Sequence, residues 1–298
     1  MSDAPAGHVA RSTVRPNCET SRRTPMRTFL HTDDGVTIDS VYDPGAVVYD
    51  VGDPSRPPVG PPARDLVFVV AHGFTGDADR PHVRRVARAL TRHGAVVTFS
   101  FRGHGASGGR STVGDREVLD LAAAVRWARE LGHARVVTVG FSMGGSVVLR
   151  HAALYRPDAA GGEEQRAGAH ADAVVSVSAP ARWYYRGTPY MRRLHWLVTR
   201  PEGRLVGRYG FRTRIHHREW DPVPMSPVEA VPHIAPVPLL IVHGDRDGYF
   251  PLDHPRMLAA AAGDQGELWL EPGMGHAEHA AGEGLLDRIG GWAVAQGG

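Results

Sequence analysis

The sequence contains no lysine, and all 34 basic residues among its 298 are arginine. Without a lysine side chain there can be no Schiff-base nucleophile, no anchor for pyridoxal phosphate and no P-loop lysine on a nucleotide phosphate. The arginines are scattered among 32 acidic residues, which leaves a formal net charge of only +2. This balance predicts no nucleic-acid partner.

Cysteine and long apolar runs are also scarce. The one cysteine, Cys18, cannot form an internal disulfide and lies in a polar stretch, so neither an oxidising compartment nor a cysteine nucleophile is indicated. No apolar run approaches the ~18 residues that span a bilayer, and residues 1–25 lack the apolar core of a signal peptide. We therefore expect a soluble, cytoplasmic protein without integral membrane association. The sequence leaves its oligomeric state open.

The N-terminal part of the chain is irregular. Residues 1–25 are rich in Ser, Thr, Arg and Pro without periodicity, which predicts a disordered leader. Two short extended segments, 26–30 and 36–41, are separated by a turn sequence and predict a hairpin. The proline-rich stretch 52–65 predicts a surface connection.

From Leu66 onward, short apolar strands alternate with amphipathic helices. This alternation is typical of a parallel sheet that is buried on both faces. It predicts a doubly wound, mostly parallel α/β fold whose core comprises residues 26–180 and 236–298. We expect helices over residues 81–93 and 116–131. The expected strands are 66–71, 95–101, 135–140, 173–179, 238–243 and 267–271.

Residues 181–235 are too long for an ordinary connection between a strand and a helix. Disordered segments are poor in aromatic residues, but this one holds eight of the chain's 22: Trp183, Tyr184, Tyr185, Tyr190, Trp196, Tyr209, Phe211 and Trp220. We therefore expect a lid insertion with its own helices. The segment also contains ten arginines against four acids, and two interpretations remain open: a solvated exterior, or contacts with an anionic part of a substrate.

The segment Gly140-Phe141-Ser142-Met143-Gly144 stands where a predicted strand passes into a predicted helix. A Gly-x-Ser-x-Gly sequence at such a junction is the nucleophile elbow, a turn so tight that neighbouring side chains must be small. The turn exposes the serine hydroxyl at the carboxyl edge of the sheet. The start of the following helix then offers backbone N–H groups to developing negative charge.

A serine nucleophile needs a histidine base that is oriented by a carboxylate. In a doubly wound sheet these partners should follow later strands, in the order acid and then histidine. The predicted strand 238–243 is followed by Asp245 and Asp247, and the predicted strand 267–271 is followed by His276. The residues by themselves leave both aspartates as candidates.

Taken together, these motifs resemble the α/β-hydrolase superfamily over about residues 27–296. The segment His72-Gly73-Phe74-Thr75-Gly76 is similar to the family's HGF-type oxyanion loop. The segment Arg102-Gly103-His104-Gly105-Ala106-Ser107 is similar to its RGHGxS loop. The resemblance implies the α/β-hydrolase fold with a lid insertion, and it points to the esterase, monoacylglycerol-lipase-like or aminopeptidase-like branch.

By this resemblance Ser142 is the nucleophile and His276 is the base. The family's HGxxD pattern selects Asp247 rather than Asp245 as the orienting acid. The backbone N–H groups of Phe74 and Met143 would form the oxyanion hole.

The expected activity is hydrolysis of a carboxylic ester of a small acyl substrate through an acyl-enzyme. Dehalogenases and epoxide hydrolases of this fold are excluded, because they carry an aspartate at the elbow. The alternatives are a thioesterase, a cofactor-free haloperoxidase or carbon–carbon hydrolase, and a non-catalytic ligand-binding protein. No cofactor is expected. No metal is expected either, because the chain has no HExxH motif and no paired cysteines, although His216 and His217 are adjacent.

Overall fold

The computed structural model describes residues 24–45, 65–156 and 168–296. Residues 1–23 of the predicted leader and residues 52–64 of the predicted surface connection lie outside these ranges.

Within the described residues, eight strands form one sheet in the order β1-β2-β4-β3-β5-β6-β7-β8. β1 and β2 form the predicted hairpin and β2 pairs antiparallel with β4, whereas all the other neighbours are parallel. The strands are β1 (Met26–His31), β2 (Thr37–Asp43), β3 (Leu66–Ala71), β4 (Ala95–Phe99), β5 (Arg135–Phe141), β6 (Ala173–Val177), β7 (Leu239–Gly244) and β8 (Gly266–Glu271). The doubly wound, mostly parallel sheet is therefore confirmed.

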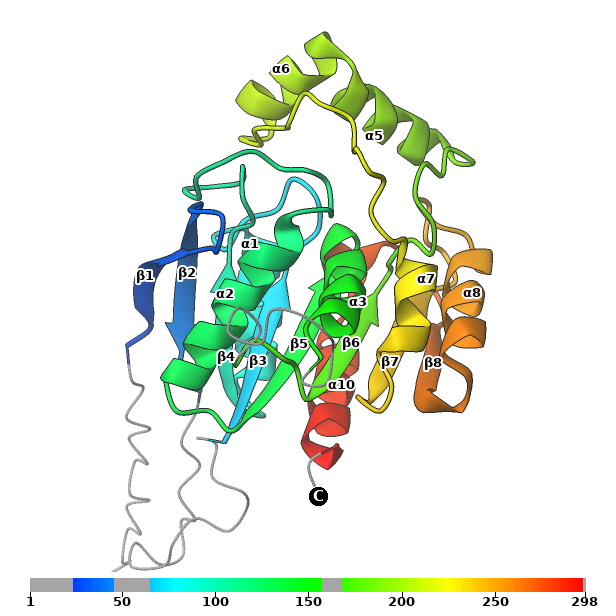
Figure 1. The fold of residues 1–298 in the computed structure, drawn as a ribbon. Coiled ribbons are helices and arrows are strands. Elements are labelled where there is room, and N and C mark those ends of the chain that lie inside the picture. Colours follow the sequence, from blue (N-terminus) through cyan, green and yellow to red (C-terminus); the bar gives the residue numbers. More distant parts are fainter. Residues whose placement is uncertain (1–23, 46–64, 157–167, 297–298) are drawn as a thin grey trace, which may run out of the picture.

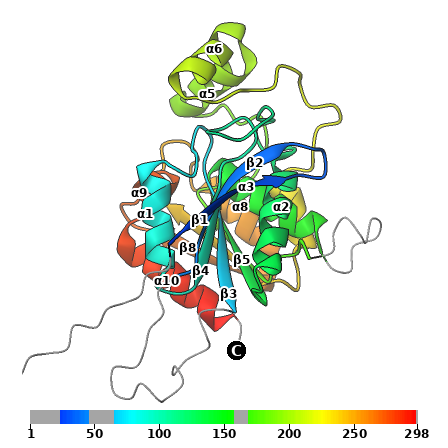
Figure 2. The same cartoon turned by 90° about the vertical axis from the view of Figure 1, so that its left-hand side faces the viewer.

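Helices cover both faces of the sheet (Figures 1 and 2). Side chains of α2 (Glu117–Glu130), α3 (Met143–Leu154) and α8 (Asp253–Ala262) join one apolar core cluster. Those of α1 (Pro81–Leu90), α9 (Ala277–Ala280) and α10 (Glu283–Ala295) join the other. Short 3₁₀ helices cover Val231–His233 and Gly263–Gln265. Within the described ranges no helix combines the length and the apolar character that a membrane-spanning segment requires.

The central strands are buried because a parallel sheet is covered on both faces. Every residue of β3, for example, is buried. The structure ends β4 at Phe99, two residues before the predicted end at residue 101. Phe101 is fully buried, as a strand residue would be, but its N–H donates to the His72 imidazole rather than to a neighbouring strand.

The segment 181–235 contains α5 (Pro189–Thr199), α6 (Pro201–Gly210) and α7 (Pro227–Ala230). Figure 1 shows α5 and α6 standing clear of the sheet, beyond its upper edge, while α7 lies against the core beside α8. The chain after α6 returns along the loop that follows β4, where His104 pairs with Thr213 and Ser111 pairs with Ile215. The segment therefore adjoins the same edge of the sheet as the loops after the central strands.

The junction between β5 and α3 has room only for glycine on both sides of Ser142. A Cβ added to Gly140 would collide with the carbonyl group of Gly144. A Cβ added to Gly144 would collide with the carbonyl group of Ala71 in β3. Both obstacles are backbone atoms, which cannot rotate away as a flexible side chain can.

We therefore predict that Gly140→Ala and Gly144→Ala each lower the free energy of unfolding in urea by about 1–3 kcal/mol, the usual cost of overpacking. Gly291→Ala in α10 is the matched control, because its added Cβ meets nothing within 4 Å. That substitution should raise the free energy of unfolding by roughly 0.5–1 kcal/mol. An elbow variant as stable as Gly291→Ala would contradict the close packing described for this junction.

Candidate active site

Ser142 occupies the turn between β5 and α3 with a positive φ of 52°. Non-glycine residues rarely adopt this backbone conformation, and they persist in it only where the surroundings impose it. Here the N–H of Ser142 donates to the carbonyl of Val177 in β6, at 2.8 Å. The serine is thus held by β5, which it follows in the chain, and by β6, to which it is hydrogen-bonded.

His276 follows β8 and directly precedes α9, and its imidazole lies between a hydroxyl and a carboxylate. Its Nε2 is 2.9 Å from the Oγ of Ser142, and its Nδ1 is 2.8 Å from the Oδ2 of Asp247. An ionised carboxylate can only accept a hydrogen bond, so the Nδ1–H of His276 donates to it. The Nε2 lone pair is then free to accept the proton of the Ser142 hydroxyl.

Asp247 follows β7, and its side chain is fully buried. Its Oδ1 accepts hydrogen bonds from the N–H groups of Tyr249 (2.8 Å) and Phe250 (3.1 Å). Burial alone would raise the pKa of Asp247, but the hydrogen bond with His276, the electrostatic interactions with His276 and His243 and the hydrogen bond from the Phe250 N–H outweigh it. They hold the pKa of the carboxyl below its ordinary value, so Asp247 is ionised at neutral pH.

The two aspartates that follow β7 have different surroundings in the structure. Asp245 is exposed, and its Oδ1 accepts a hydrogen bond from the N–H of Gly273, at 2.6 Å. Asp247 is the aspartate that contacts His276. The structure therefore brings together Ser142, His276 and Asp247.

The two expected oxyanion donors belong to segments that adjoin Ser142. Met143 is the first residue of α3, where backbone N–H groups have no acceptor within the helix. Phe74 follows Gly73, and a Cβ added to Gly73 would lie 3.4 Å from the Cβ of Ser142. The loop that carries Phe74 thus passes directly beside the serine.

Two buried histidines join the loop after β3, which carries Phe74, to the loop after β4. The His72 imidazole contacts the carbonyl of Gly73 through Nδ1 (2.7 Å) and accepts the N–H of Phe101 through Nε2 (3.0 Å). Burial lowers its pKa to about 3, so His72 is neutral and serves as a hydrogen-bonded brace. His104 accepts the N–H of Thr75 at 3.3 Å, and burial lowers its pKa to about 4.

An aromatic stack covers His276, and sequence reasoning missed it. The ring of Tyr249 lies on the His276 imidazole, with centroids 4.1 Å apart and an interplanar angle of 22°. Tyr190 of α5 stacks on Tyr249, at 4.9 Å and 30°. The hydroxyl of Thr188, which caps α5, also donates to the carbonyl of Tyr249 at 3.0 Å. The only signal in the sequence is the position of Tyr249 two residues after Asp247.

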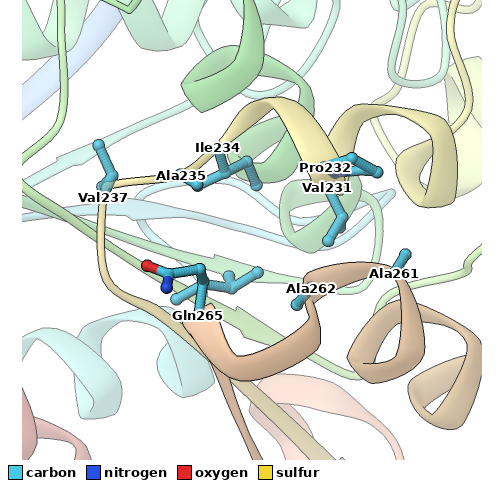
Figure 3. A pocket seen from close by; sticks show the side chains of 9 residues that line it. Val231, Pro232, Ile234, Ala235, Val237, Ala261, Ala262 and Gln265 are labelled. Carbon is cyan, nitrogen blue, oxygen red and sulfur yellow. The ribbon is translucent and has the colours of Figure 1, made fainter.

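Two surface hollows include none of the residues Ser142, His276 and Asp247 in their lining. One of about 380 Å³ is lined by Pro189, Arg192, Arg193 and Trp196 on α5. Figure 3 shows the other, of about 210 Å³, whose lining side chains are apolar except for Gln265. Neither hollow offers a nucleophile with a neighbouring base. The candidate active site is therefore the one built around Ser142.

Known proteins resemble this chain in sequence. The family model described as "Alpha/beta hydrolase family" matches residues 66–287. A monoacylglycerol lipase of Mycolicibacterium smegmatis is 28% identical over 254 residues, which cover 77% of this chain and 85% of that protein.

Solved structures share the fold at lower identity. An esterase of Pyrococcus furiosus superposes with a TM-score of 0.66 at 22% identity, over 93% of this chain and 92% of that one. The alpha/beta hydrolase GrgF from Penicillium sp. sh18 gives a TM-score of 0.64 at 17% identity, over 92% of this chain and 99% of that one. Because the family model matches well over half of the chain, the protein belongs to the alpha/beta hydrolase family and is a hydrolase enzyme.

Proposed function

We propose that this enzyme hydrolyses a carboxylic ester of a small acyl substrate, with Ser142 as nucleophile, His276 as base and Asp247 as orienting acid. The observation that carries the proposal is the unbroken line of two hydrogen bonds from the Ser142 hydroxyl through His276 to Asp247. A serine hydroxyl is a weak nucleophile until an adjacent base takes its proton.

In the proposed reaction the Ser142 Oγ attacks the ester carbonyl while its proton passes to the Nε2 of His276. Asp247 accepts the Nδ1–H and stabilises the imidazolium that forms. The N–H groups of Phe74 and Met143 donate to the oxyanion of the tetrahedral intermediate. His276 then protonates the departing alkoxide, which leaves as an alcohol. A water molecule deprotonated by His276 attacks the acyl-Ser142 ester, and the acid is released as Ser142 regains its proton.

The named relatives favour an ester over the other acyl bonds that the same residues can cleave. One is called a monoacylglycerol lipase and another an esterase. A panel of chromogenic acyl esters and acyl-thioesters of graded chain length distinguishes an esterase from a thioesterase. A fluorophosphonate probe that fails to label Ser142 would favour a ligand-binding protein without turnover.

We further propose that the segment 181–235 acts as a lid over this site. The contacts from α5 to Tyr249 support this role. Tyr190 stacks on Tyr249, and Gly248 leaves room for the Tyr190 ring, which lies 2.9 Å from where a Cβ of Gly248 would be. The position of α5 is therefore linked through one aromatic ring to the proposed base.

The first prediction concerns the nucleophile and the base. Ser142→Ala and His276→Ala should each lower kcat for a chromogenic ester by about 10⁴-fold or more. The double variant should be no slower than either single variant, because the groups act as a unit. Additive losses, with all three variants folded by circular dichroism, would contradict these assignments.

The second prediction uses the two aspartates as a matched pair. Asp247→Asn should lower kcat by about 10³- to 10⁴-fold, because an amide can hold His276 in the wrong tautomer. Asp245→Asn changes the same functional group two residues away and should leave kcat within about twofold, since Asp245 bonds a backbone N–H instead. The measurement is kcat of both variants from steady-state kinetics. A large loss of kcat in Asp245→Asn with little loss in Asp247→Asn would identify Asp245 as the orienting acid.

The third prediction concerns the aromatic stack. Tyr249→Ala removes the ring that lies on His276 and should lower kcat by about 3- to 10-fold, the factor that one aromatic contact supplies. Tyr249→Phe keeps the ring and should retain the wild-type kcat. Tyr190→Ala should change kcat in the same direction by a smaller factor. Equal losses in the Phe and Ala variants, or an effect on KM alone, would exclude a positioning role for the ring.

A further inference from the structure

Behind the proposed oxyanion loop, two helices that are distant in the chain bring three potential metal ligands together. His82 lies in the first turn of α1, and Glu278 and His279 lie in α9. One ligand atom from each of the three side chains lies within 4.8 Å of the other two. The imidazoles of His82 and His279 lie side by side, with ring centroids 3.9 Å apart.

The carboxylate in this cluster is buried without a strong cationic partner. Glu278 is 2% exposed, and its Oε1 accepts the N–H of Gly73 at 2.9 Å. The nearby guanidinium of Arg85 donates to the backbone carbonyls of Glu278 and Ala281 instead. A buried carboxylate is normally paired with a cation or bound to a metal. Within the described part of the chain, the only ion-pair contact of the Glu278 carboxylate is with His82, at 3.8 Å.

One nitrogen of the His82 imidazole lacks a hydrogen bond in the part of the chain that the structure describes. Its Nε2 is shielded from solvent and has no hydrogen-bond partner among the described residues. At 3.8 Å from the Oε1 of Glu278 it is too far for a hydrogen bond. Buried polar atoms without a partner are rare and call for a physical explanation. An ion between His82 and Glu278 would satisfy both.

We propose that His82, Glu278 and His279 form a binding site for a first-row divalent cation, with Zn²⁺ as the best fit. Two imidazoles and one carboxylate form a donor set that zinc takes, with water as the fourth ligand. The two nitrogen donors disfavour Mg²⁺ and Ca²⁺, which prefer oxygen ligands. His279 is exposed and leaves the cluster open to solvent on one side. Tetrahedral bonds of ~2.0–2.1 Å place ligand atoms about 3.3 Å apart, so binding requires these atoms, which now lie within 4.8 Å of one another, to move closer together.

This site goes beyond the proposed ester hydrolysis and does not depend on it. Its three ligands come from α1 and α9, and nearly two hundred residues separate His82 from Glu278. Motifs of local spacing therefore could not reveal it. Because Glu278 also accepts the N–H of Gly73, a bound ion would fasten α1, α9 and the proposed oxyanion loop to one another.

The experiment is calorimetric titration of ZnCl₂ into the untagged full-length protein after chelator treatment and dialysis. We expect saturable binding with one ion per chain and a rise in Tm in the presence of excess zinc, because a ligand that binds only the folded state stabilises it. His279→Ala should weaken this binding at least about tenfold, since even residues that merely support a ligand contribute 10- to 100-fold. The side chain of His279 is exposed, so this variant should fold normally.

Further variants separate this site from adventitious binding to surface histidines. His82→Ala and Glu278→Gln should weaken binding as His279→Ala does, and the glutamine retains an acceptor for the Gly73 N–H. His217→Ala is the matched control, because it removes an exposed histidine of a stacked pair on the segment 181–235. Its affinity for zinc should equal that of the wild type. The proposal is overturned if the wild type shows no one-to-one binding, or if His82→Ala and His279→Ala bind zinc as tightly as the wild type does.

Discussion

The architecture of this hydrolase depends on the close approach of three backbone segments at the end of β5. Gly140 and Gly144 let the chain turn so sharply that Ser142 takes a positive φ, and the carbonyl group of Ala71 in β3 occupies the space that a side chain at residue 144 would need. The turn holds the serine between β3 and β6, at the edge of the sheet where the loops after β7 and β8 begin. Those two loops supply Asp247 and His276, so the geometry of one turn and the order of the strands together determine the hydrogen-bonded line from serine to aspartate.

Buried polar side chains near Ser142, His276 and Asp247 hold the surrounding loops in place and take no part in the proposed reaction. His72 joins the loop after β3 to the loop after β4 and is kept neutral by burial. Arg102 is almost fully buried and forms ion pairs with Asp120 and Asp34, which tie the same loop to α2 and to the turn after β1. Such groups are costly to bury unless their hydrogen bonds are complete. Because the hydrogen bonds of these buried groups are complete, the loop that carries Phe74 is held beside Ser142 without a contribution from the substrate.

The sequence predicted the parts of the structure that local pattern controls. Apolar runs located the central strands within two residues, and the glycines around Ser142 located the sharp turn after β5. The predicted end of β4 was wrong because Phe101 is as buried as a strand residue although its N–H is bound by an imidazole. Order along the chain left both Asp245 and Asp247 as candidates, and only the resemblance to the family's HGxxD pattern selected Asp247, the aspartate that contacts His276. The stack of Tyr190 on Tyr249 and the cluster around Glu278 also escaped prediction, since each joins elements whose meeting depends on the folded path of the loops.

The central claim is that Ser142 becomes acylated by a substrate ester. The most direct measurement is rapid mixing with a chromogenic ester, followed by acid quenching and mass spectrometry of the digested protein. The account predicts that the peptide containing Ser142 gains the mass of the acyl group, and that this adduct disappears on the time scale of turnover. Release of the chromophore at the full steady-state rate with no adduct on that peptide, or with an adduct on another residue, would contradict it.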